Sequence, residues 1–180
     1  MHRLFVAIRP PRTVREPLLD LMEALPPARW QDGEQLHLTL RFIGAVDRPT
    51  AEDIAAALGG VRHGTFEIAV DGVGRFERNG RTAALWAGVS PRTPLEALHR
   101  KIDHALVRAG FAPERRAYLP HITLARFGRG GGDVETFLAR HAGLAGPRFP
   151  VSDFVLFESH LGKGGARYEA VARYPLTARD

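Results

Sequence analysis

Two short segments of the sequence match each other, His37-Leu38-Thr39-Leu40 and His121-Ile122-Thr123-Leu124, and they lie 84 positions apart. The triplet His-x-Thr alone is a weak signal, because His63-Gly64-Thr65 also matches it. Requiring Leu or Ile in the middle and Leu afterwards removes this third copy, and the composition predicts far fewer than one match to the longer pattern. The repeat is therefore not an accident of composition.

The repeated pattern is typical of a β-strand with one buried face. Successive side chains of a strand point to opposite faces, so the His and the Thr of each segment share one face. The residues that alternate with them are expected to pack into the core, and these are Leu38, Leu40, Ile122 and Leu124. Each copy thus presents one imidazole and one hydroxyl together.

Outward from the two segments, the spacing of apolar residues predicts the same order of elements in each half of the chain. In the first half we expect strands at 4–8, 36–43 and 66–70, a helix after Pro10 and Pro11, and a helix at 49–58. In the second half we expect strands at 83–89, 121–126 and 149–157 and helices at 95–109 and 134–141. A last extended segment at 168–174 follows a glycine-rich turn and is expected to form a hairpin with the preceding strand.

The repeated order predicts two similar lobes in an α+β or α/β fold. Helices separate the strands of each half, so each lobe's helices are expected to cover one face of a sheet and leave the other face free. The ligand site is then expected in a cleft between the two free faces.

The charge of the chain favours an anionic partner. Its 25 basic and 20 acidic residues give a formal net charge of +5, and only Lys101 and Lys163 among the basic residues are lysines. The planar guanidinium of Arg binds phosphate with two hydrogen bonds, so this bias suits a phosphorylated or nucleic-acid ligand. Replacement of Lys by Arg through genome base composition is the alternative explanation.

Several kinds of site and location are excluded by what the sequence lacks. It contains no cysteine, which excludes disulfides, a thiolate zinc site and a cysteine nucleophile. His99 and His104 are five apart on one predicted helix and do not share the face that metal ligands need, so we expect no metal, no cofactor and two solvent-exposed imidazoles. The apolar run at 4–8 is far shorter than a membrane span or a signal sequence, so the protein is expected to be soluble and cytoplasmic.

Two facing histidines suit acid–base chemistry near neutral pH. One neutral imidazole takes a proton from an attacking water while the other, protonated, donates a proton to the leaving oxygen. The alternative is that Thr is present as a good strand former and that each His is a half-buried surface residue. Packing does not require His at both places, which favours the catalytic interpretation.

The sequence resembles the two-histidine (2H) phosphoesterases, and more narrowly the bacterial and archaeal RNA 2′,3′-cyclic phosphodiesterases. The resemblance covers the whole chain and rests on four segments: Arg3-Leu4-Phe5-Val6-Ala7-Ile8, His37-x-Thr39-x-x-Phe42, His121-x-Thr123-x-x-Arg126 and Gly164-Gly165-Ala166-Arg167-Tyr168. It implies one domain over residues 1–180 with intertwined lobes and with its motifs at 37–42 and 121–126. It also implies an α+β, bilobal fold of pseudo-twofold duplicated β-α-β-α-β halves, in which two antiparallel-rich sheets flank a central cleft and the helices lie outside.

The resemblance further implies a role for each site residue. His37 is expected to be the general acid to the O3′ leaving group and His121 the general base for water, although the two roles could be exchanged. Thr39 and Thr123 are expected to hold phosphate oxygens. Arg126 is expected to clamp the phosphate and Phe42 to stack on the base.

Strand geometry conflicts with two of these roles. Arg126 and Phe42 each lie five positions after their His, and an odd separation in a regular strand points away from the cleft. Either the strand ends or bulges there, or both residues are structural. The structural alternatives are a core aromatic for Phe42 and a surface salt bridge for Arg126.

Other segments near the two motifs are weaker candidates. The segment Gly128-Arg129-Gly130-Gly131-Gly132-Asp133 lacks the end of a P-loop, so a flexible connection with Asp133 as a helix cap is favoured over a phosphate cradle. Near the motifs, Arg115, Arg116, Arg129 and Trp30 are candidates either to line the cleft and guide RNA or merely to be solvated.

The sequence thus predicts metal-independent hydrolysis of RNA 2′,3′-cyclic phosphate ends to 2′-phosphates, by a monomer without a cofactor or a membrane partner. One alternative is reversible cleavage and ligation of 2′,5′ linkages, in which a ribose hydroxyl replaces water as the nucleophile. Another is a non-catalytic module that binds RNA or a nucleotide.

Overall fold

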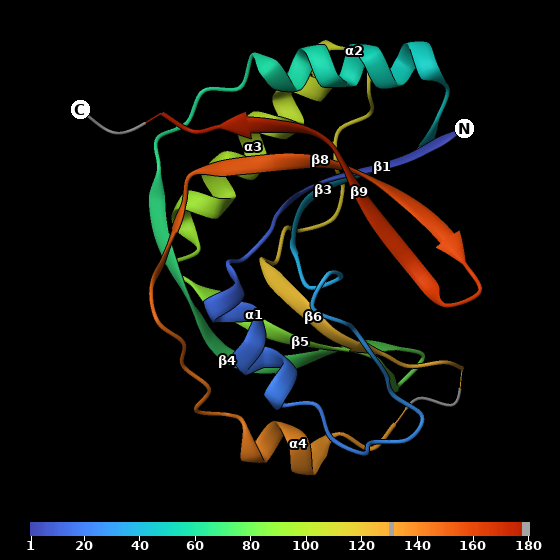
Figure 1. The fold of residues 1–180 in the computed structure, drawn as a ribbon, viewed down its shortest axis with the longest axis vertical. Helices are drawn as coiled ribbons and strands as arrows, with labels where there is room; N and C mark the ends of the chain where they lie inside the picture. Colours follow the sequence, from blue (N-terminus) through green and yellow to red (C-terminus); the bar gives the residue numbers. More distant parts are fainter. Residues whose placement is uncertain (130–131, 178–180) are drawn as a thin grey trace.

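The computed structural model describes residues 1–129 and 132–177, and all of its paired strands form one antiparallel sheet (Figure 1). The strand order is β7-β4-β5-β6-β3-β1-β8-β9, and β2 also pairs with β6. The strands are β1 (His2–Ile8), β2 (Arg29–Trp30), β3 (Leu38–Val46), β4 (Phe66–Arg78), β5 (Arg81–Ser90), β6 (His121–Arg126), β7 (Phe149–Val151), β8 (Asp153–Gly162) and β9 (Gly165–Pro175). The helices are α1 (Arg12–Asp20), α2 (Arg48–Gly59), α3 (Thr93–Arg108) and α4 (Glu135–Arg140).

The sheet has two halves that meet between β3 and β6. One half contains β6, β5, β4 and β7, and the other contains β3, β1, β8 and β9. Among the residues that the structure describes, the halves are joined by one pair of residues, Leu38 with Ile122, so there is one continuous sheet where two were expected. Both partners of this pairing belong to the repeated motifs, which therefore lie at the centre of the fold.

Each half of the sheet takes strands from both halves of the sequence, so the lobes are not simply the first and the second half of the chain. The segment 149–157, expected as one strand, is interrupted at Ser152. Before Ser152, β7 pairs with β4 in one lobe; after it, β8 pairs with β1 in the other. The hairpin of β8 and β9 is as expected and closes at Gly162 and Gly165, where Gly165 has a φ of 110°.

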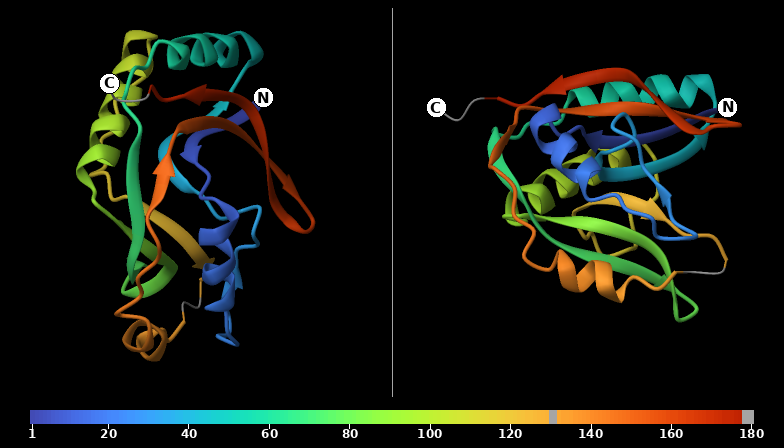
Figure 2. Two further views of the ribbon diagram at one scale, coloured as in Figure 1. Left: turned by 60° about the vertical axis from the view of Figure 1, so that its left-hand side comes forward. Right: turned by 60° about the horizontal axis from the view of Figure 1, so that its bottom comes forward.

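The helices lie on the outside of the sheet (Figures 1 and 2). α2 and α3 contact β1, β3 and β9, whereas α1 and α4 lie toward β4 and β5 in Figure 1. α3 begins and ends within two residues of its expected bounds and buries Leu95, Leu98 and Ile102, whose spacing places them on one helix face. At the start of α2, the Asp47 side chain accepts a hydrogen bond from the Thr50 N–H at 3.0 Å.

The core confirms the expected faces of the two motif strands. Leu38, Leu40, Ile122 and Leu124 are at most 1% exposed and belong to one cluster of buried residues that includes residues of both lobes. A second, smaller cluster of Phe5, Ala7, Val155 and Phe157 lies on the opposite face of β1 and β8. In the part of the chain that the structure describes, no helix is both long and apolar enough to cross a membrane.

Candidate active site

The pairing at the junction of the two lobes brings both motifs together. β3 and β6 are antiparallel, and Leu38 lies opposite Ile122 with both side chains in the core. Extending this register by one residue on each side places His37 opposite Thr123 and Thr39 opposite His121. Since neighbours in a strand alternate between faces, both imidazoles and both hydroxyls emerge on the face opposite the core.

Both histidines are held in the same way. The Nδ1 atom of His37 lies 2.6 Å from the carbonyl oxygen of Gln35, and the Nδ1 atom of His121 lies 2.7 Å from that of Leu119. A carbonyl oxygen only accepts, so Nδ1 carries the hydrogen in each ring. The Nε2 atom of each ring is left to exchange a proton with a ligand.

Aromatic side chains enclose each imidazole. The ring of His37 has its centroid 5.0 Å from that of Phe5 and 5.1 Å from that of Tyr168. On the other side of the junction, His121 lies 4.8 Å from Phe76 and 6.2 Å from Trp86. These contacts fix the orientation of both rings and remove water from around them.

This enclosure lowers the pKa of both histidines. Burial lowers the pKa of His37 to about 4, opposed by its hydrogen bond to Gln35 and assisted by the positive charges of Arg126, His121 and Arg9. Burial also lowers the pKa of His121, and the charge of Arg126 adds to this effect. Both imidazoles are therefore neutral in the free protein at pH 7, and a bound anion would favour their protonation.

A β-bulge in β6 resolves the conflict over Arg126. Against β5, Thr123 lies opposite Trp86, but Ala125 lies opposite Leu85 and Arg126 opposite Ala84. β6 therefore contains one extra residue between Thr123 and Ala125, which reverses the alternation. Arg126 thus emerges on the same face as Thr123 and His121.

The strand β3 contains the corresponding bulge. Against β1, Thr39 lies opposite Ala7, Arg41 opposite Val6 and Phe42 opposite Phe5. The extra residue between Thr39 and Arg41 returns Phe42 to the face of Thr39. Phe42 is 58% exposed, with its ring centroid 6.2 Å from that of Phe5, so it is not a core aromatic.

At each bulge, a group outside the two paired strands donates a hydrogen bond to a backbone carbonyl. The carbonyl of Leu40 accepts from Nδ1 of His99 at 2.7 Å, and that of Leu124 accepts from the Gln31 N–H, just after β2, at 2.8 Å. The hydroxyl of Tyr118 donates to the carbonyl of Thr39 at 3.2 Å. Residues outside β3 and β6 therefore stabilise the two bulges by hydrogen bonds.

The expectation that His99 is solvated is wrong, whereas His104 is exposed as expected. The ring of His99 is half-buried and stacks on Tyr118 with centroids 4.2 Å apart and planes at 6°. Its position four residues after Leu95 and three before Ile102 places it beside the buried face of α3. This spacing could have predicted from the sequence that His99 is partly buried. The role of Tyr118 had no comparable signal in the sequence.

A cleft of about 1010 Å³ lies over this face of the sheet. His37, Phe42, Arg126 and Tyr168 line it, together with the tip of the β8–β9 hairpin. The side chain of Gln35 donates from Nε2 to the carbonyl of Ala166 at 2.7 Å and ties this hairpin to the segment before His37. Of the weaker candidates, Trp30 lines the cleft, whereas Arg115 and Arg116 are exposed on the loop before β6.

Comparison with known proteins identifies the family. The model of the 2′-5′ RNA ligase superfamily matches residues 10–163. The chain belongs to this superfamily. Within it, relatives named RNA 2′,3′-cyclic phosphodiesterase include a Geobacillus stearothermophilus protein that is 30% identical over 87% of this chain, and an Aeropyrum pernix protein that is 37% identical over 56% of it. The matches span 50% and 57%, respectively, of the length of these two relatives.

Superfamily members of known structure share the whole fold. The crystal structure of Escherichia coli LigT complexed with 3′-AMP covers 98% of both chains at 26% identity, with a TM-score of 0.82. Other structures of E. coli LigT are complexed with NADP⁺, ATP and phosphate. The expected α+β fold class and the expected family resemblance are thereby confirmed, although the two expected sheets are one continuous sheet.

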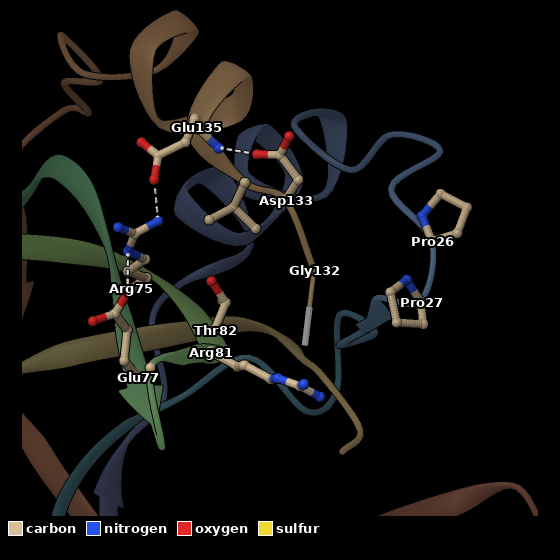
Figure 3. A pocket seen from close by; sticks show the side chains of 11 residues that line it. Pro26, Pro27, Arg75, Glu77, Arg81, Thr82, Gly132, Asp133 and Glu135 are labelled. Carbon is tan, nitrogen blue, oxygen red and sulfur yellow. Dashed lines mark hydrogen bonds and ion pairs between the residues drawn. The ribbon is translucent and has the colours of Figure 1, made fainter. Parts of the chain in front are cut away.

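The protein described in Figure 1 has a second pocket, of about 540 Å³, beside α4 (Figure 3). Its charged side chains are largely paired with one another: Arg75 contacts both Glu135 and Glu77, as Figure 3 shows. Asp133 accepts from the Glu135 N–H at 3.2 Å at the start of α4, although Val134 occupies the N-cap position. Gly130 and Gly131 of the glycine-rich segment lie outside the described residues.

Within residues 1–129 and 132–177, no group of three or more His, Cys, Asp or Glu side chains is placed to hold a metal ion.

Proposed function

We propose that this protein hydrolyses the terminal 2′,3′-cyclic phosphate of RNA to a 2′-phosphate. The observation that carries the proposal is the pair of imidazoles at the lobe junction, each with Nδ1 bound to a backbone carbonyl and with no hydrogen bond from Nε2 to residues 1–129 or 132–177. A cyclic phosphodiester needs one group to accept a proton from water and another to donate one to the leaving oxygen. Two such imidazoles supply both groups.

In the proposed reaction His121 accepts a proton from water as the water oxygen forms a bond to phosphorus. The bond from phosphorus to O3′ breaks, and His37 donates a proton to O3′, which leaves a 3′-hydroxyl and a 2′-phosphate. The near symmetry of the two half-sites is equally compatible with exchanged roles. The negative phosphate offsets the charges that lower the pKa of His37 and so favours the protonated acid.

The other site residues have proposed roles that fit their positions. Thr39 and Thr123 each lie across the junction from a histidine, where their hydroxyls can donate to phosphate oxygens. Arg126, beyond Thr123 on the same face, would bind two phosphate oxygens through its planar guanidinium and stabilise charge in the transition state. The exposed ring of Phe42 would stack on the base.

Two further arguments support this substrate class. The named relatives are RNA 2′,3′-cyclic phosphodiesterases, and 3′-AMP, NADP⁺, ATP and phosphate, which are bound in crystal structures of E. coli LigT, all contain phosphate. The superfamily's name favours a second activity at the same site, the reversible ligation of 2′,5′ linkages. A ribose hydroxyl would then occupy the place of the attacking water. A monomeric state, a single domain over residues 1–180 and a cytoplasmic location stay predictions.

The deciding experiment incubates the purified protein with a short RNA that ends in a 2′,3′-cyclic phosphate, and identifies the product end by mass and by chromatography against RNAs that end in a 2′- or a 3′-phosphate. We expect a 2′-phosphate, at an unchanged rate in EDTA because imidazoles carry both proton transfers. Adding an RNA with a free 5′-hydroxyl tests for ligation. An unchanged cyclic end would refute the proposal, and complete loss in EDTA restored by a divalent ion would refute metal independence.

A further inference from the structure

The short strand β2 places a second arginine beside Arg126. β2 pairs with the edge of β6 beyond its contact with β3, and its register puts Arg29 opposite Arg126 and Trp30 opposite Ala125. Residues directly opposite each other in an antiparallel pair share one face. Because Arg126 lines the cleft, Arg29 does so too, and both appear among the residues that line the cleft.

This pair of like charges is unfavourable without a ligand. Opposed like charges on neighbouring strands destabilise a sheet. Within residues 1–129 and 132–177, no carboxylate lies within ion-pair distance of Arg29 or Arg126. Some arginines elsewhere are paired: Arg15 has Glu34 at 3.5 Å, and Arg41 has Asp103 at 2.9 Å. Together with Arg3 three arginines line the cleft, and the guanidiniums of Arg29 and Arg126 are thus available to anions from solution.

Along β6 and then across to β2, the residues of this face lie at increasing distance in register from the histidines. His121, Thr123 and Arg126 share one face of β6, and Arg29 lies one strand further, beside Arg126, where these two arginines line the cleft. A phosphodiester carries a single negative charge, which balances one guanidinium and not two. The next phosphate of a nucleic-acid chain would supply the second charge.

We propose that Arg29 forms a second phosphate subsite, which binds the phosphodiester next to the terminal phosphate while Arg126 binds the terminal one. This inference rests on the proposed function and makes it more specific: the preferred substrate is an oligoribonucleotide rather than a lone nucleoside cyclic phosphate. The segment of β2 and Gln31 then has two roles. The N–H of Gln31 supports the bulge that orients Arg126, and Arg29 supplies the second positive charge.

The test measures binding of ligands that are not turned over. Dissociation constants of a nucleoside 3′-monophosphate and of a dinucleotide with the same 3′-phosphate are compared for the wild type, Arg29→Gln and Arg115→Gln. The control Arg115→Gln removes the same charge from an exposed loop position. We expect Arg29→Gln to weaken the dinucleotide about tenfold and the mononucleotide less than about twofold, because one charge-assisted contact is lost. Arg115→Gln should leave both unchanged.

A dinucleotide whose internal linkage is an uncharged methylphosphonate removes the other partner of the proposed contact, so that the variant and the ligand together form a double-mutant cycle. The wild type should bind it about as weakly as Arg29→Gln binds the normal dinucleotide, and Arg29→Gln should lose nothing further. Equal weakening of both normal ligands by Arg29→Gln would show that Arg29 grips the terminal phosphate, and no weakening of either would show that it binds none; both results overturn the subsite. A wild type that fails to hydrolyse cyclic ends but shows the expected binding pattern would refute the proposed function alone.

Discussion

The two half-sites of the cleft are alike at the histidine and different five residues later. In each, a His before or at the start of a strand bonds to the carbonyl two residues earlier, and a Thr shares its face. Beyond the bulge, one strand presents Phe42 and the other Arg126. The duplicated part of the site therefore suits proton transfer, whereas the diverged positions suit the two unlike ends of a nucleotide, an apolar base and an anionic phosphate.

The bulges themselves are supported differently. The carbonyl of Leu40 in β3 depends on the side chain of His99, whereas the carbonyl of Leu124 in β6 depends on the backbone N–H of Gln31. A backbone donor survives most substitutions, while a side-chain donor is lost with its residue. The position of Phe42 should therefore be more sensitive to distant mutations than that of Arg126.

The largest effect is expected where the half-sites are alike. His37→Ala and His121→Ala should each lower turnover by roughly 10²–10⁴-fold as losses of a general acid or base. The double variant should be much less impaired than the product of the two effects, because both groups act in one transition state. Single-turnover rates measure this.

The matched control for these variants is His63→Ala. This residue belongs to the third His-x-Thr triplet but lies before β4, where its ring packs against that of Phe66 at 5.4 Å. The variant His63→Ala should turn over the substrate at the wild-type rate. Near-normal turnover of either His37→Ala or His121→Ala would contradict the assignment of the pair.

The next effect tests the half-site that carries Arg126. Arg126→Lys keeps the charge but loses the planar fork, so turnover at saturating substrate should fall about tenfold or more. Arg115→Lys, at an exposed position on the loop before β6, should turn over normally. Equal, near-normal rates for both variants would show that charge alone matters at position 126, and the proposed clamp would be wrong.

The sequence predicted which face of each motif strand is buried, but it could not show whether a bulge lies within the strand. Alternation predicted the buried faces of Leu38 and Ile122 correctly because each strand is regular as far as its Thr. Counting onward with the same period placed Phe42 and Arg126 on the wrong face, since a bulge is specified by partner strands that are distant in sequence. The correct face of these residues required the registers of β1 and β5.

Other misses have the same origin in long-range contacts. The two residues of β2 are too few to show any period, yet they pair with β6 at its far end. The polar pair Ser152-Asp153 marks the crossing within the segment 149–157, but it does not show that β7 and β8 pair with different strands. Local pattern therefore predicted the elements but not which lobe each of them joins.

A pH effect should distinguish the two histidines from exposed ones. Since burial lowers the pKa of His37 to about 4, the folded state excludes a proton that the unfolded chain accepts near its ordinary pKa of 6.5. The free energy of unfolding is therefore expected to fall as the pH drops from about 6.5 to about 4, and to be unaffected by this group above 6.5. Urea titrations across this range measure it.

The variant His37→Gln should show a shallower fall over the same interval, because it has no proton to gain. His121→Gln should change the slope in the same direction, as its pKa is also lowered. His104→Gln, which alters an exposed ring on α3, is the control and should follow the wild type. Parallel curves for His37→Gln and the wild type would contradict the enclosure of this ring.

The smallest effect concerns the support of the β3 bulge. Burial raises the pKa of Tyr118, so its hydroxyl stays protonated and donates to the carbonyl of Thr39. Tyr118→Phe leaves this carbonyl without its donor, and the bulge that directs Phe42 should loosen. We expect KM for a nucleoside 2′,3′-cyclic phosphate to rise about threefold to fivefold with kcat nearly unchanged, in line with the loss of one hydrogen bond worth about 1 kcal/mol.

Tyr174→Phe provides the comparison that separates positioning from stability. The hydroxyl of Tyr174 donates to the carbonyl of Ala55 at 3.0 Å, on the α2 side of the sheet, so its loss removes a similar bond far from the bulge. Both variants should lose a similar amount of unfolding free energy, but only Tyr118→Phe should raise KM. The rise should vanish with a ribose 2′,3′-cyclic phosphate that lacks the base, because Phe42 then has nothing to stack on. If KM rises equally with and without the base, the support of Thr39 acts on the phosphate instead, and the division of labour between the two half-sites is wrong.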